Sequence, residues 1–289
     1  GAENVAVGQN ALQANTDANY NTAIGRSALY ANTTGASNTA VGREALGANT
    51  TGTRNLAIGY QAYDASDTEN DNLAIGFQAM TTNTAGGTKN VAVGNYALDA
   101  LTSGDNNTVV GYQAGTSNNT GGNNTALGSE ALRDNTTAGN NVAIGVFSLK
   151  VNTTGASNTA VGKGTLEANT TGAQNTAVGE GALDANTTAN NNTALGFDAL
   201  GANTEGTQNL AVGEESLLAN TTGGQNVAIG SESMKANTTG SNNVALGRNA
   251  LKGNTTAANN VALGMDTLVA NTTGTRNLAI MKNALNASD

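Results

Sequence analysis

A glycine recurs every 17 residues along almost the whole chain, and this period constrains the fold more than any other feature. The series starts at Gly8, and its spacing changes once, to 18 residues between Gly76 and Gly94. The string NTTGASNTAVG occurs at 32–42 and again, unchanged, at 152–162. A short fixed period over a whole chain is typical of a solenoid or fibre, whose repeats contact mainly their neighbours. We therefore expect a single continuous repeat domain over residues 1–289, which opens in mid-repeat and reads as an excerpt of a longer fibre.

The repeat can be read column by column, with column 1 four residues before the recurring glycine. Column 1 is Asn in every repeat, column 3 is Ala in all but one, where Val109 stands, and column 4 is always Val, Ile or Leu. Column 5 is the glycine, while columns 6 and 7 vary and carry many charges. Columns 8, 9 and 11 are mostly Ala, Leu and Ala, and columns 12 to 15 are mostly Asn-Thr-Thr-Gly.

This pattern predicts two short strands and two corners. Columns 2 to 4 alternate with period two, as a strand does, and columns 8 to 11 form a second short stretch with Leu inward. Asn-Thr-Thr-Gly and the column 5 glycine supply the corners, because Asn and Gly tolerate positive φ. A helix over columns 7 to 12 would be too short to be stable alone, and leucine-rich repeats are longer. The expected fold is all-β, a parallel β-solenoid (β-roll) of about 17 coils with 17 residues and two short strands in each; stacking at ~4.8 Å gives a rod roughly 80 Å long.

The invariant columns predict a ladder and an interface. Stacked column 1 side chains would form an Asn ladder, with amides bonded along the stack. Columns 2 and 4 share one face of the strand and are larger, so we expect them to fill the core, with column 3 pointing outward. Columns 1 to 5 carry no charge, which favours close approach of another chain. The expected ladder includes Asn38, Asn141, Asn158, Asn175 and Asn226; the expected oligomer interface includes Ala40, Ala143, Ala160, Ala177 and Ala228.

The strand motifs resemble those of a known family. Asn-Thr-Ala-Val-Gly at 38–42, 158–162 and 175–179, and Asn-Val-Ala-Ile-Gly at 141–145 and 226–230, are similar to the repeats of YadA-like trimeric autotransporter heads. The full repeat resembles those of phage tail-fibre-like and bacterial surface proteins, although its period exceeds that of the YadA head. The resemblance implies a left-handed β-roll of three identical chains at the cell or virion surface. It implies an extracellular structural segment of an adhesin or tail fibre, a stiff rod for attachment and display.

Composition argues against catalysis and against several partners. The chain has no His, Cys, Pro or Trp, so it lacks the commonest general base and thiolate ligands. We expect no enzyme activity, catalytic residue, metal site or cofactor. A net charge of −9 opposes a nucleic-acid groove, and no apolar run is long enough for a membrane span. A lyase or glycosidase using paired carboxylates is the less favoured alternative, because the acids stand in variable columns and indicate a solvated edge: Glu44, Glu130, Asp198, Glu214 and Glu232.

One group of aromatic side chains is a candidate ligand strip. Six of the nine aromatics fall in columns 6 and 7, and four of them lie in consecutive coils: Tyr60, Phe77, Tyr96 and Tyr112. They could bind a host-surface glycan or receptor, or pack against a neighbouring chain. Other functions left open are an ice-binding solenoid with Thr arrays and a single-chain solenoid filament subunit. The Asn-Thr-Thr corners also match the N-glycosylation pattern, which we interpret as a by-product of the turn.

Overall fold

Each repeat contains one three-residue strand, formed by columns 2 to 4. The computed structural model describes residues 1–83 and 86–286 and divides into two compact units, residues 1–143 and 144–289. Within each unit the strands are parallel and pair in register, so that every column stacks on itself. Ala23 pairs with Ala40 and Ala40 with Ala57, for example. The prediction of an all-β parallel solenoid with a 17-residue coil is confirmed.

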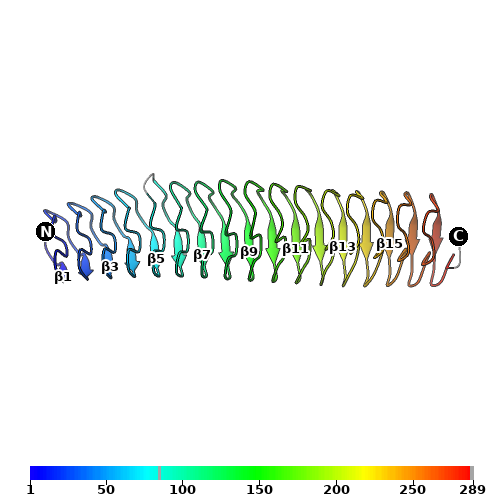
Figure 1. Cartoon of the computed structure of the whole chain (residues 1–289), viewed down its shortest axis with the longest axis horizontal. Helices are drawn as coiled ribbons and strands as arrows, with labels where there is room; N and C mark the ends of the chain where they lie inside the picture. Colours follow the sequence, from blue (N-terminus) through cyan, green and yellow to red (C-terminus); the bar gives the residue numbers. More distant parts are fainter. Residues whose placement is uncertain (84–85, 287–289) are drawn as a thin grey trace. The chain divides into compact units, whose positions relative to one another are not determined.

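The first unit stacks its strands as successive arrows in Figure 1. Its strands are β1 (Val5–Val7), β2 (Thr22–Ile24), β3 (Thr39–Val41), β4 (Leu56–Ile58), β5 (Leu73–Ile75), β6 (Val91–Val93), β7 (Thr108–Val110) and β8 (Thr125–Leu127). The pairing continues in register across the one 18-residue repeat, from Leu73 to Val91. The extra residue is therefore absorbed outside the strands.

The second unit repeats the same arrangement. Its strands are β10 (Thr159–Val161), β11 (Thr176–Val178), β12 (Thr193–Leu195), β13 (Leu210–Val212), β14 (Val227–Ile229), β15 (Val244–Leu246), β16 (Val261–Leu263) and β17 (Leu278–Ile280). Strand β9 (Val142–Ile144) spans the boundary between the two units.

The prediction of a second strand in each coil is wrong, because columns 6 to 11 form turns. Leu46 in column 9 has φ 49° and Glu44 in column 7 has φ 61°, and both columns keep this left-handed backbone in most coils. The backbone still bonds to the next coil, since the N–H of Leu46 donates to the carbonyl of Ala62 at 3.1 Å. A left-handed residue costs about 1–2 kcal/mol, which full burial of the Leu side chain and this inter-coil bond offset. An Ala-Leu pattern carries no signal for positive φ at Leu, so periodicity could not reveal it.

The predicted inside and outside of the strand are reversed. Ala40 in column 3 is 0% exposed, whereas Ile58 in column 4 is 38% exposed. Column 3 thus faces the core of its own coil, opposite the buried Leu of column 9, while columns 2 and 4 face outward. The alanines predicted as an oligomer interface lie inside their own coils and cannot touch another chain: Ala40, Ala143, Ala160, Ala177 and Ala228.

One coil shows why column 3 is small. Column 9 is Gly115 in the coil that carries Val109, the one exception to Ala in column 3. A Cβ added to Gly115 would lie 3.4 and 3.5 Å from the two γ-carbons of Val109. The two columns therefore share one space, and Ala in column 3 leaves room for Leu in column 9. Where column 9 loses its side chain, column 3 enlarges.

Candidate functional site

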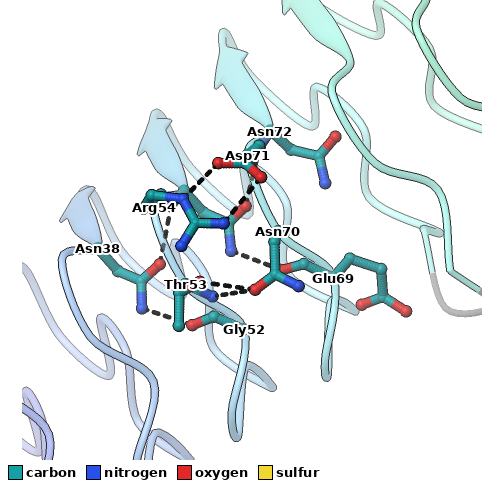
Figure 2. Close-up of polar contacts among 9 residues, drawn as sticks. Asn38, Gly52, Thr53, Arg54, Glu69, Asn70, Asp71 and Asn72 are labelled. Carbon is teal, nitrogen blue, oxygen red and sulfur yellow. Dashed lines mark hydrogen bonds and ion pairs between the residues drawn. The ribbon is translucent and has the colours of Figure 1, made fainter.

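The column 1 asparagines form a buried ladder that joins each coil to itself and to the next. Asn38 donates its side-chain N–H to the carbonyl of Gly52 at 2.7 Å, and its Oδ1 accepts the backbone N–H of Asn55 at 2.9 Å (Figure 2). Both contacts recur along the two units. In most coils the backbone N–H of the column 1 Asn donates to Oδ1 of the column 1 Asn one coil earlier. The predicted ladder residues are all buried: Asn38, Asn141, Asn158, Asn175 and Asn226. The principal bond along the stack goes to a backbone N–H, whereas the sequence suggested bonds between side-chain amides.

Column 12 forms a second buried ladder, which the sequence analysis assigned only to turn chemistry. Asn49 donates to Oδ1 of Asn32 at 2.9 Å and to the carbonyl of Gly52 at 3.1 Å. This ladder is interrupted where Ser66 and then Leu101 replace Asn, and the amide oxygens just before each interruption, in Asn49 and Asn83, have no hydrogen-bond partner. Because column 12 is buried, the Asn of the N-glycosylation pattern is inaccessible in the folded chain.

Polar contacts also tie neighbouring coils at the corner that follows column 15. Figure 2 shows the Arg54 guanidinium facing the carboxylate of Asp71 in the next coil, with N–O distances of 2.5 and 2.9 Å. The Arg54 partner lowers the pKa of the Asp71 carboxyl. Beside this pair, the Thr53 hydroxyl donates to Oδ1 of Asn70 at 2.8 Å. Both contacts join residues that are 17 positions apart, and they help to hold the register of the stack.

The outward side chains of columns 2 and 4 form a continuous surface in each unit, which we call the outer strand face. It is built from Val, Ile, Leu and Thr, and no charged residue occurs in either column. Its large side chains are half-buried in many coils and exposed in others; the exposed ones include Ile24, Ile58, Leu127, Val178, Leu195 and Leu246. Apolar surface that is at least partly accessible in every coil is a usual mark of an interaction site.

The four predicted strip residues do lie together, on the first unit. The ring centroids of Tyr60 and Phe77 are 5.3 Å apart and nearly parallel, at 14°. The plane of the Tyr96 ring lies at 70° to that of Phe77, with ring centroids 5.4 Å apart, and at 81° to that of Tyr112, with centroids 6.3 Å apart. The Arg43 guanidinium covers the first ring, 5.5 Å from its centroid. The rings therefore form one continuous ladder along four coils.

Carboxamides accompany these rings, and the sequence analysis missed them. Each of the four coils carries one aromatic and one carboxamide in columns 6 and 7. Gln78 donates to Oε1 of Gln61 at 3.0 Å, and Gln61 donates to Oε2 of Glu44 at 3.0 Å. We call this set the aromatic–amide strip: Tyr60, Gln61, Phe77, Gln78, Asn95, Tyr96, Tyr112 and Gln113.

Most of the carboxylates singled out in the sequence are committed to ion pairs. Glu130 contacts Arg133 at 2.7 Å, and Glu44 contacts Arg43 at 3.0 Å. Glu232 pairs with Lys252 and Lys235, whose hydrogen bonds lower its pKa to about 2. Such carboxylates are anions held by cations, which suits neither a general acid nor a free nucleophile.

The other two acids differ in their surroundings. Glu214 is exposed to solvent. Asp198 lies with Phe197 and Asp184 in an open groove of about 270 Å³ on the second unit. Burial, and then the charges of Glu215 and Glu180, raise the pKa of Asp198. Within residues 1–83 and 86–286, no three acidic side chains are grouped so that they could hold a metal ion.

Comparisons with known proteins give no relative for this chain. A scan against models of protein families found no match, and a search of curated proteins found none. No helix in the part of the chain that the structure describes is both long and apolar enough to cross a membrane.

Proposed function

We propose that this chain is a structural segment of an extracellular fibre, in an adhesin or tail-fibre-like protein at a cell or virion surface. It acts by stiffness and display, and it catalyses no reaction. The observation that supports this most is the outer strand face, which repeats in every coil without a charged residue. A surface that repeats with the coil suits assembly along the fibre, whereas a single active site needs one exceptional coil.

The two buried Asn ladders support the stiffness of each unit. The coil that starts at Asn38 cannot separate from the coil before it without breaking the bond from Asn38 to Oδ1 of Asn21 and, in column 12, the bond from Asn49 to Oδ1 of Asn32. Both bonds are buried, and breaking them would leave polar groups unpaired at about 1–3 kcal/mol each. Bending or fraying within a unit is therefore opposed by every coil.

We propose that the partner of the outer strand face is further copies of the same chain. Eight strands at ~4.8 Å spacing give each unit a face about 34 Å long, and such a face is large to leave in water. Because each column repeats with the coil, identical chains in parallel would match Val, Ile, Leu and Thr along the whole face. Closed cyclic assembly satisfies identical surfaces. The resemblance to YadA-like heads favours three copies.

The mass in solution tests the assembly. We expect light scattering to give three times the mass of one chain over a range of concentrations. Glu placed in column 4 of three neighbouring coils, as Val161→Glu, Val178→Glu and Leu195→Glu, should dissociate the assembly because unpaired charges cannot enter a dry interface. Parent protein that stays a monomer at every concentration, or a triple variant that keeps the parent mass, would contradict the proposal. A mass of two chains would support the outer strand face as the interface and would contradict an assembly of three chains.

A matched control uses the same coils. Column 14 is exposed there, and one natural repeat already carries Glu205 in this column. Thr154→Glu, Thr171→Glu and Thr188→Glu add the same three charges on another side of the coils. We expect this control to keep the parent mass.

A further inference from the structure

The aromatic–amide strip is the longest run of consecutive coils in which columns 6 and 7 carry no charge. Columns 6 and 7 carry no Asp, Glu, Lys or Arg in any of its four coils. In the second unit, every coil from 158 onward has at least one charge in these columns: Lys163, Glu180, Asp198, Glu214, Glu215, Glu232, Arg248, Asp266 and Lys282. Ion pairs border the strip, Arg43–Glu44 before it and Arg133–Glu130 after it.

The exposed groups of the strip are of two complementary kinds. Phe77 is 40% exposed and Tyr112 is 50% exposed, so the rings offer apolar surface to solvent. The carboxamides of Gln61 and Gln78 and the tyrosine hydroxyls both donate and accept hydrogen bonds. Each coil thus presents an apolar plate beside a neutral polar group, and the pair repeats along the stack.

The ring geometry leaves aromatic faces for a ligand. Tyr60 and Phe77 stack on each other, so their facing surfaces are occupied. Tyr96 makes edge-to-face contacts with Phe77 and Tyr112, and such contacts cover less ring surface than stacking does. Tyr112, the last ring of the ladder, is 50% exposed, so a ligand lying beside the coils can contact its surface.

We propose that the aromatic–amide strip binds a neutral polysaccharide. A sugar ring has apolar C–H faces that suit an aromatic plate and hydroxyl groups that both donate and accept, as the carboxamides do. Arg43, the cation over the Tyr60 ring, is already paired with Glu44, and the chain's net charge of −9 repels an acidic polysaccharide. A protein partner fits less well, because four coils span only about 15 Å and a stable interface needs ~800 Å² on each side. This site would add ligand binding to the structural role and does not depend on it.

Affinity electrophoresis of the whole chain tests the proposal, with dextran, yeast mannan, laminarin and hydroxyethyl cellulose as neutral probes and alginate as the acidic comparison. We expect at least one neutral polymer to retard the chain and alginate to have no effect. Tyr112→Ser should weaken the retardation tenfold or more. Phe197→Ser is the matched control, because Phe197 stands in the same column and is 48% exposed but lies outside the strip; it should bind as the parent does.

A second variant separates binding from stability. Gln113→Ala removes a half-buried amide beside Tyr112 and leaves the ring ladder intact, so it should also weaken retardation while the melting temperature stays within a few degrees of the parent. The proposal is overturned if no neutral polymer retards the chain, if alginate does so equally, or if Tyr112→Ser and Gln113→Ala bind as the parent does. If Tyr112→Ser lowers the melting temperature and no polymer retards the parent, the rings serve packing alone.

Discussion

Val109 and Gly115 offer a direct test of how the core is arranged. They are the column 3 and column 9 residues of one coil, and an added Cβ at Gly115 would already touch the γ-carbons of Val109 at 3.4 and 3.5 Å and Leu98 Cδ2 at 3.2 Å. If both columns fill one space, substitutions at the two sites must be coupled. If column 3 pointed outward, they would be independent.

The magnitudes follow from this geometry. Val109→Ala removes two buried carbons, which costs about 1.6 kcal/mol in transfer and about 2–3 kcal/mol with the cavity. Gly115→Leu alone forces four new carbons against Val109 and Leu98, at about 1–3 kcal/mol. The φ of Gly115 is 56°, close to the 49° of Leu46, so the backbone already suits Leu in this fold. The double variant restores the Ala and Leu of the other coils and should be about as stable as the parent, which gives a coupling of about 3–6 kcal/mol.

The stability of the parent, the two single variants and the double variant is measured by hydrogen exchange of the coil over residues 107–123 and compared with urea unfolding. Local exchange is needed because long repeat arrays depart from two-state unfolding. Additive effects, with the double variant as unstable as the sum of the single variants, would refute the shared core. A double variant that regains parental protection while each single variant loses it would support that core.

Three further outcomes follow from the contacts. Asn186→Ala should lower the free energy of unfolding, measured by hydrogen exchange, by about 2 kcal/mol more than Asn49→Ala does. Asn186 lies within an intact ladder, whereas the Oδ1 of Asn49 is already without a partner. Equal losses in the two variants would reject ladder continuity. Asp184 is largely exposed, and partial desolvation followed by nearby carboxylates raises its pKa, so its ionisation above that pKa destabilises the fold by a small amount; Asp184→Asn should raise the melting temperature slightly at pH 7 and lose this gain near pH 3, with Glu205→Gln as the control, and a gain unchanged with pH would contradict the assignment. Gly179→Ala should destabilise its coils by more than about 2 kcal/mol, because φ is 133° and a Cβ would lie 2.3 Å from the carbonyl oxygen of Gly196; a melting temperature within 1 °C of the parent would contradict this contact.

The 17-residue period predicted the coil, the parallel register and the strand of columns 2 to 4. A strict repeat places the same residue types at the same position in every coil, so stacking each column on itself gives every coil the same contacts. It could not predict the direction of the side chains. Alternation gives two faces and leaves open which is inner, and the larger residues suggested the wrong one. The correct signal was in the sequence, in the pairing of Val109 with Gly115, since a compensating exchange of volumes identifies columns that share space.

The candidate site was predicted only in part. The four aromatic residues were found because they are rare and stand in consecutive coils. Their carboxamide neighbours, such as Gln61 and Gln78, were missed because Gln in a variable column is unremarkable until hydrogen bonds place it beside the rings. The column 12 ladder was missed for a different reason. Turn formation alone is enough to explain an Asn in this position of the sequence. Only the burial of column 12 in the structure shows that its side chain points inward.

The distribution of side chains links the fold of one chain to the proposed assembly. Each coil typically encloses one Leu, two small Ala and two Asn, while its largest strand residues, such as Ile58 and Leu127, face outward. The apolar area that one chain buries per coil is therefore small, and the enclosed amides contribute mainly by satisfying buried backbone groups and one another. Burial of the outer strand face between copies would add the larger apolar contribution. If so, folding and association are coupled, and the melting temperature should rise with protein concentration, as mass action requires when partners bind only the folded chain. The Val161→Glu, Val178→Glu and Leu195→Glu variant should lose this dependence and melt lower. A parent melting temperature that stays constant over a hundredfold range of concentration, with the parent mass falling to one chain on dilution, would separate folding from assembly and show that the polar core suffices.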